Sequence, residues 1–285
     1  MSKVTPLFPM LYALCTLEDV PLYSYEGNYA PMLMVIDVGN TNLVFGLFED
    51  TLLKAKFRMS TDTARTADEI GLHIVQFCNH FSLSLYDVDD VVISSVVPPL
   101  MYTLLHAIEK YMGKHPWLVG ETLPTGLASL AQEPLGHDRA VTLIGALHRY
   151  GAPLILVDFG TATKVDALDE HGAYLGGVIC PGIKISMDAL FAKAAKLPRV
   201  EIKKPRSVIG VNTVEQMQAG AVYGFVGSVE GIVSNMKREM GHPRIPVVAT
   251  GGLSTLISAH TALIDHTNNN LTMEGLQLLY ARRPQ

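Results

Sequence analysis

The sequence is poor in cysteine. It has three cysteines, Cys15, Cys78 and Cys180, and no C-x-x-C motif. An odd number of widely spaced cysteines argues against a disulfide framework and against a zinc site. This usage is typical of a reducing compartment, so we expect a cytoplasmic protein.

Charge and long apolar runs are also scarce. Charged residues make up 17% of the chain, the net charge is −5, and no basic run occurs. Neither nucleic acid nor an anionic membrane surface is therefore expected as a partner. No apolar run has transmembrane length. By contrast, 285 residues, of which 48% are hydrophobic, suffice for two α/β domains with well-buried sheets.

Residues 1–31 are expected to form an N-terminal extension outside these domains. The stretch "VTPLFPMLYALCTL" is moderately apolar and follows one lysine, as in a signal peptide. Pro6 and Pro9 interrupt it, and no clean small-residue cleavage site follows. We therefore favour an extension, or a true start at Met32 or Met34.

One pattern occurs twice in the chain. In "MLMVIDVGNTN" an apolar run ends in Asp37, and a glycine and small polar residues follow; "LILVDFGTAT" repeats this around Asp158, 158 − 37 = 121 positions later. A second tight turn and a new strand follow each copy, which predicts two β-meanders. The order βββ-α-β-α-β-α then repeats, which predicts two similar α/β domains over residues 32–149 and 150–285 with a cleft between them.

Several helices can be placed from their start signals. A capping box at Thr66–Glu69 predicts a helix through His80, and a further helix is expected to begin near Asp138. "TVEQ" at 213–216 is expected to cap a long helix that runs to about Met240. Glycines recur along that helix in a smooth stripe that suits close helix packing, either within the chain or in a dimer: Gly220, Gly224, Gly227 and Gly231.

The paired turns suggest a chemistry. A Gly-rich turn exposes backbone N–H groups that can bind phosphate oxygens, and an adjacent aspartate can hold the cation that bridges to phosphate. A single Asp-x-Gly-x-Thr is more often only turn geometry. Two copies in matched context, with a buried strand ending at Gly251-Gly252 that would let an adenosine lie against the backbone, favour a nucleotide polyphosphate in the cleft.

A phosphoryl acceptor also needs a group that takes up its proton. "GHDR" offers Asp138 at a helix start, where free N–H groups keep a carboxylate ionised, and Arg139 as a planar cation for an anionic group. Asp138 as a helix cap paired with Arg139 on the surface is an equally good interpretation.

With these motifs in view, the sequence resembles the type III pantothenate kinases over almost all of residues 32–285. The motifs are, in order, "DVGNTN" (37–42), "SSVVP" (94–98), "GHDR" (136–139), "DFGTAT" (158–163), "GGVICPG" (176–182), "IGVNTVEQMQAG" (209–220) and "ATGG" (249–252). This family shares a superfamily with acetate kinase, sugar kinases, heat-shock chaperone ATPases and actin. The resemblance therefore implies two duplicated ribonuclease H-like (actin-like ATPase) domains, each a mixed sheet flanked by helices.

The resemblance also implies an activity: transfer of the γ-phosphoryl group of ATP to pantothenate, the first step of coenzyme A synthesis, in a cytoplasmic homodimer. Asp138 would be the proton acceptor, and Asp158 would hold a monovalent cation, K⁺ or NH₄⁺, with Mg²⁺ accompanying ATP. The implied pantothenate contacts are Gly136, His137, Asp138, Arg139 and Thr213, with Thr213 reaching the neighbouring subunit's site. The implied ATP contacts are Asp37, Val38, Gly39, Asn40, Thr41, Asn42, Leu43, Val44 and Thr161.

The chain departs from the family pattern at two places. Lys164 stands where a threonine is usual after "GTAT", and it is expected either to reach a phosphate or to point to solvent. The stretch before "GHDR" lacks the tyrosine that commonly lines the pantothenate pocket. Two other functions remain open: another small-molecule kinase of the superfamily, such as a sugar kinase, and an accessory protein that has lost turnover.

Overall fold

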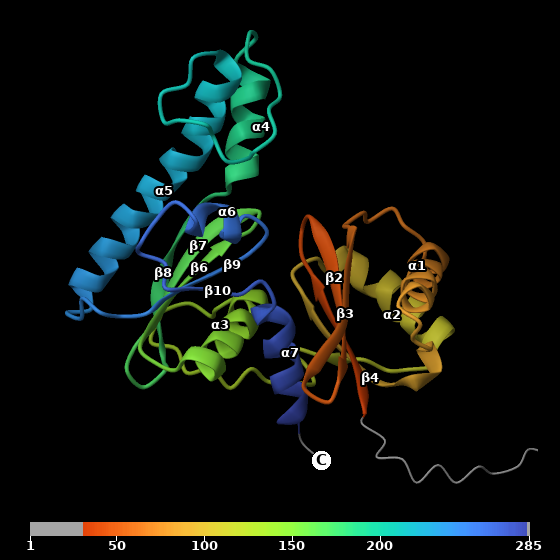
Figure 1. Ribbon diagram of the computed structural model, residues 1–285. Coiled ribbons are helices and arrows are strands. Elements are labelled where there is room, and N and C mark those ends of the chain that lie inside the picture. Colours follow the sequence, from red (N-terminus) through yellow and green to blue (C-terminus); the bar gives the residue numbers. More distant parts are fainter. Residues whose placement is uncertain (1–30, 284–285) are drawn as a thin grey trace, which may run out of the picture. The chain divides into compact units, whose positions relative to one another are not determined.

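Each half of the chain folds around a five-stranded mixed sheet (Figure 1). The computed structural model describes residues 31–283, which belong to one structural unit. The first sheet has the order β3-β2-β1-β4-β5 and the second the order β10-β9-β6-β7-β8. The strands are β1 (Met32–Val38), β2 (Asn42–Glu49), β3 (Leu52–Ser60), β4 (Val88–Ser95), β5 (Trp117–Leu118), β6 (Leu154–Phe159), β7 (Ala162–Leu168), β8 (Tyr174–Pro181), β9 (Val247–Thr250) and β10 (His266–Thr267).

The two sheets have the same topology. The first strand of each, β1 or β6, pairs antiparallel with the next strand in sequence and parallel with a later one, β4 or β9. Residues 41–50 and 161–170 even share the same alternation of buried and exposed positions. The predicted fold class, two duplicated α/β domains with mixed sheets, is confirmed.

Three helices follow the first meander: α1 (Ala67–His80), α2 (Pro98–Met112) and α3 (His137–Tyr150). The capping box forms as predicted, because the Thr66 hydroxyl accepts the Glu69 N–H while the Glu69 carboxylate accepts the Thr66 N–H.

The second half adds α4 (Ile183–Lys193), α5 (Thr213–Glu239), α6 (Ser254–Ser258) and α7 (Leu271–Ala281). The long helix is present, but Asn212 caps it instead of Thr213: the Asn212 side chain accepts the Glu215 N–H at 3.0 Å. Asparagine and threonine can both cap a helix, and the extended backbone of Asn212 decides which one does so here.

Helices and sheets alternate in layers. The face of the first sheet that carries Ile36 and Phe45 packs on α1 and α2, and its opposite face, with Val35 and Val92, packs on α3 and α7. The second sheet packs one face on α3 and the other on α5 and α6. Figure 1 shows α3 and α7 side by side, so one helix pair covers an inner face of both sheets.

The last helix, α7, therefore packs on the first sheet, although it follows the second sheet in the chain. The predicted division at residues 149 and 150 stays a prediction. The predicted extension lies outside the described residues except for Pro31, as does Cys15; Cys78 and Cys180 are free thiols. Within residues 31–283, no helix combines the length and apolarity that crossing a membrane requires.

Candidate active site

A cavity of about 610 Å³ is lined by residues of both sheets. The turn after β1 and the turn after β6 both border it, as the duplicated pattern predicts. The cavity lining includes these predicted residues: Asp37, Gly39, Asn40, Thr41, Asn42, Val44, Asp158, Thr161, Gly251 and Gly252. The other two members of the predicted ATP segment, Val38 and Leu43, are buried in the core of the first sheet.

The two turns meet across this cavity. The Thr41 and Thr161 hydroxyl oxygens lie 2.7 Å apart and share a hydrogen bond. Each turn is closed by its glycine, since Gly39 N–H donates to the Asn42 carbonyl and Gly160 N–H donates to the Ala162 carbonyl. The exposed tips thus bring backbone amides and hydroxyls from both sheets to one place, as phosphate binding requires.

Gly251 is required by the backbone at the end of β9. It has φ +92°, and a Cβ there would lie 2.6 Å from the backbone of Phe159 and 2.7 Å from Asp158 Oδ1. The "ATGG" turn therefore approaches the second aspartate more closely than a side chain would permit.

Asp37 is a strongly perturbed acid of the site. Burial, together with the neighbouring carboxylates of Asp138 and Asp158, raises the pKa of Asp37 to about 7. Its Oδ1 atom is shielded from solvent and has no hydrogen-bond partner among the described residues. A buried, unpaired carboxylate oxygen is costly, which indicates a place for a cation.

Lys164 lies between two of these carboxylates. Its Nζ atom is 2.9 Å from Asp138 Oδ2 and 3.5 Å from Asp158 Oδ2. Burial alone would lower the pKa of Lys164, but Asp158 and Asp138 outweigh it, so that pKa is raised and the side chain is an ammonium. The expectation that Lys164 points to solvent is therefore wrong, because the carboxylates attract it, while the expectation that it reaches a phosphate stays a prediction.

Burial raises the pKa of Asp158 as well, against the opposing effect of Lys164. The two residues are direct cross-strand partners, Asp158 on β6 and Lys164 on β7. Asp138 reaches them from the first turn of α3, so the lysine links the candidate base to the second turn.

The other three residues of "GHDR" each lie in a different environment near Asp138. Gly136 is the N-cap residue of α3, and His137 is exposed, with its ring packed where a Cβ of Gly120 would lie. Arg139 turns toward the second sheet: it forms an ion pair with the buried Asp166 and donates to the Tyr174 hydroxyl at 2.8 Å. An aromatic residue on β8 thus contacts Arg139, whereas the stretch before "GHDR" has none.

Two cavity cations on β3 were missed by the sequence reasoning. Lys56 and Arg58 line the cavity, and Lys56 Nζ donates to the Asn269 carbonyl at 2.6 Å. The signal was present in "LKAKFRM", where Ala55, Phe57 and Met59 are buried while the cations alternate with them. Such a strand has one core face and one basic face.

Thr213 is exposed at the first position of α5 and is not among the residues that line the cavity. Close to it in sequence, large apolar side chains are exposed: Val208, Ile209, Val211 and Val214. The glycine stripe on α5 is open too, because a Cβ at any of its four positions would meet nothing within 4 Å. Of the two interpretations of the stripe, packing within the chain is therefore not what the structure shows.

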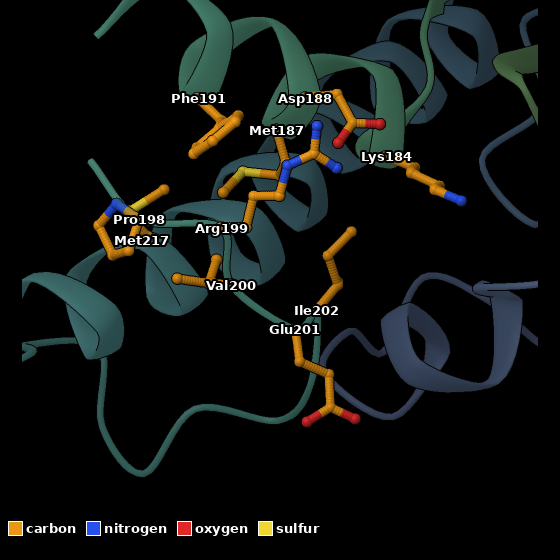
Figure 2. A pocket seen from close by; sticks show the side chains of 10 residues that line it. All are labelled: Lys184, Met187, Asp188, Phe191, Pro198, Arg199, Val200, Glu201, Ile202 and Met217. Carbon is orange, nitrogen blue, oxygen red and sulfur yellow. The ribbon is translucent and has the colours of Figure 1, made fainter. Parts of the chain in front are cut away.

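A second cavity, of about 310 Å³, lies between α4, α5 and the loop around Arg199 (Figure 2). Phe191, Met187 and Met217 line it, and the Arg199 guanidinium stacks over the Phe191 ring at 4.6 Å. Of the predicted site residues, none is among its lining residues. Met217 packs there, as expected of a core methionine.

Solved structures that share this fold include the following three. A Campylobacter jejuni protein assigned to the Baf family of transcriptional activators is 15% identical, with a TM-score of 0.55, and the match covers 87% of this chain and 98% of that one. A Sinorhizobium meliloti protein classed as a 2-dehydro-3-deoxygalactonokinase gives 12% identity, a TM-score of 0.52, and coverage of 88% and 96%. Component A of (R)-2-hydroxyglutaryl-CoA dehydratase from Acidaminococcus fermentans is 14% identical, with a TM-score of 0.51, and the match covers 88% of this chain and 97% of that one.

At these identities the three structures show the fold alone. The sequence comparison goes further, because the family model described as type III pantothenate kinase matches residues 33–235, which hold both turns, "GHDR" and the start of α5. The chain belongs to the type III pantothenate kinase family.

Proposed function

We propose that the cavity between the two sheets catalyses phosphorylation of pantothenate by ATP to 4′-phosphopantothenate, the first step of coenzyme A biosynthesis. One observation carries this proposal: the two duplicated turns meet at one cavity that Asp37 and Asp158 line, and Lys164 connects Asp158 to Asp138, which begins α3 beside it. That arrangement supplies phosphate ligands, cation ligands and a separate base, which are the parts that phosphoryl transfer needs.

ATP would lie with its phosphates over the two turns. The segment Asp37–Val44 offers the backbone amide of Asn40 and the Thr41 hydroxyl, and Thr161 offers the matching hydroxyl from the second sheet. Lys56 and Arg58 add two positive charges from β3. The open space at Gly252, where a Cβ would meet nothing within 4 Å, suits the nucleoside.

Asp37 fits a Mg²⁺ ion that arrives with ATP. Its unpaired Oδ1 atom borders the cavity, and Mg²⁺ in such sites binds one or two carboxylates and the substrate phosphates. Bound there, Mg²⁺ would neutralise charge on the transferred phosphoryl group. Such binding would give the unpaired Oδ1 atom a partner and would offset the energetic cost of burying the charged carboxylate.

Asp138 would accept the proton of the pantothenate hydroxyl. It is partly exposed, stands at the positive end of α3, and is held by Lys164 at 2.9 Å. Gly136, His137 and Arg139 would shape the pantothenate site around it. Arg139 is kept rigid by Asp166 and Tyr174 and presents a planar cation next to the base.

A monovalent cation, K⁺ or NH₄⁺, is the expectation that fits least. Asp158 would be its ligand, yet the Lys164 ammonium lies 3.5 Å from the same carboxylate. Two cations would then compete for one carboxylate, so no step is assigned to K⁺ here.

A homodimer would complete the pantothenate site. By the resemblance to the family, Thr213 would contact pantothenate in the partner's site, and it does not line the cavity of its own chain. The open glycine stripe of α5 and the exposed Val208, Ile209 and Val211 offer the apolar surface for that contact. By the same resemblance, we place the enzyme in the cytoplasm.

The test is an ADP-release assay with ATP and Mg²⁺. We expect ADP formation that depends on pantothenate and is not seen with glucose or without an acceptor. ADP release with glucose instead of pantothenate would indicate a sugar kinase. If no acceptor produced any ADP release, the protein would be an accessory protein without turnover.

A further inference from the structure

The position of Lys164 suggests that the protein carries its own monovalent cation. Lys164 Nζ lies 2.9 Å from Asp138 Oδ2 and 3.5 Å from Asp158 Oδ2, so one ammonium bridges the carboxylates of α3 and β6. The side chains of all three residues are about three-quarters or more buried, with exposed fractions of 20% for Lys164, 26% for Asp138 and 24% for Asp158.

The backbone fixes this arrangement. Lys164 and Asp158 are opposite each other in the β6–β7 ladder, so the lysine reaches Asp158 from the neighbouring strand. Asp138 is held from the other side by α3. The Thr142 hydroxyl of this helix shares a hydrogen bond of 2.9 Å with the Thr272 hydroxyl of α7. An ammonium placed by two rigid elements costs little ordering when substrate binds.

Charge supports the same conclusion. The negative charges of Asp138 and Asp158 make ionisation of Asp37 less favourable, Asp138 does the same to Asp158, and ATP adds more negative charge to the cavity. Some cation must offset this repulsion. An ammonium group and a potassium ion are alike in size and charge, and the ammonium already occupies the carboxylate that the ion would use.

We propose that the Lys164 ammonium takes the place of the monovalent cation at Asp158, so that this enzyme needs neither K⁺ nor NH₄⁺. The inference rests on the proposed kinase function for its kinetic test. Lys164 acts here as a positioning residue: it orients Asp138 and neutralises Asp158, and both then face ATP and the acceptor.

The kinetic test compares three proteins in chloride salts of Na⁺, K⁺ and NH₄⁺ at equal ionic strength. Wild-type rates of pantothenate-dependent ADP release should agree within about twofold in all three salts. Lys164→Thr should be slow in Na⁺ and accelerate at least about tenfold in K⁺ or NH₄⁺. The control Lys54→Thr removes an exposed lysine that pairs only with Glu49, and it should match wild type.

A severalfold stimulation of wild type by K⁺ over Na⁺ would overturn the proposal without the need of any variant. A Lys164→Thr enzyme that is as active in Na⁺ as in K⁺ or NH₄⁺ would also overturn it, and so would a folded Lys164→Thr enzyme that is inactive in every salt. A lost packing contact would lower activity equally in all three salts, so the salt specificity separates the two causes.

Thermal unfolding without substrates separates this proposal from the proposed function. K⁺ or NH₄⁺ should raise the melting temperature of Lys164→Thr more than Na⁺ does, because an ion that binds only the folded state stabilises it. The wild type should show no such preference. If neither protein phosphorylates pantothenate, the kinase proposal fails while these melting temperatures still decide the role of Lys164.

Discussion

At the scale of single residues, three carboxylates and one ammonium define the site. Asp37 and Asp158 end the first strands of the two sheets, Asp138 begins α3, and Lys164 joins the latter two. Asp37 has an unpaired oxygen, whereas Asp138 and Asp158 share Lys164, and we expect a different role for each acid: cation ligand for Asp37, charge anchor for Asp158 and base for Asp138. Two predictions test that division.

Asp138→Asn should fold normally and turn over at least about a hundredfold more slowly, because it removes general-base assistance. Steady-state ADP release, with circular dichroism as the folding check, measures this. The matched control is Asp50→Asn, the same change at an exposed turn whose φ of +58° asparagine tolerates. Near-normal turnover of Asp138→Asn would mean that Asp138 is not the base and serves only as a partner of Lys164; the structure already excludes the helix-cap interpretation, because Gly136 is the N-cap residue.

Asp37→Asn should stabilise the protein without ATP, and more so at higher pH. The pKa of Asp37 is raised to about 7 from 3.8, so its neutral form favours folding at low pH and that contribution is lost as pH rises through about 7. The pKa difference corresponds to about 4 kcal/mol at most, and we expect about 2–4 kcal/mol.

Urea unfolding of both proteins from about pH 5 to about pH 8 measures the effect of Asp37. The gap in unfolding free energy should widen toward the higher pH. A gap that stays constant across this pH range would show that Asp37 is not the perturbed acid.

At the scale of elements, the contact between α3 and α7 positions the base. A Cβ on Gly275 would collide with the Val141 carbonyl, and one on Gly145 would collide with the Leu271 carbonyl. Two glycines therefore let the helix backbones touch, and this pair is the layer shared by both sheets. Since Asp138 begins α3, the same contact determines where the base stands.

Gly275→Ala should lower the unfolding free energy by about 1–3 kcal/mol, because the backbone of α3 has to move. An alanine in a helix is otherwise about 1 kcal/mol better than glycine, so helix propensity acts in the opposite direction. Urea denaturation checks this against Gln76→Ala, a change at an exposed position on α1 where stability should not fall. Equal stability of the two variants would contradict the close contact.

At the scale of the whole molecule, the open glycine stripe predicts a second copy of the chain. The wild type should have a mass of 2 × 31.0 = 62.0 kDa in light-scattering chromatography. Gly224→Gln leaves the single chain undisturbed but places a large side chain on the stripe, so the dimer should dissociate. Because Thr213 would then leave its partner's site, KM for pantothenate should rise more than KM for ATP.

The control for the interface is Glu109→Gln, an exposed position on α2 away from the stripe, which should remain dimeric. If Gly224→Gln stays at the dimer mass while the wild type is a dimer, the interface lies on another surface. A monomeric wild type would contradict the proposed assembly altogether.

The sequence by itself determined the duplication, the fold class and the turn residues, because apolar runs, capping boxes and Asp-Gly turns act through local geometry. It also carried the alternating cations of β3, which a period-two pattern could have revealed. Only the tertiary structure decided that α7 covers the first sheet, that Lys164 faces Asp138 and Asp158, and that Arg139 turns to Asp166. These contacts join residues far apart in sequence, and packing between layers, not any local signal, brings them within reach.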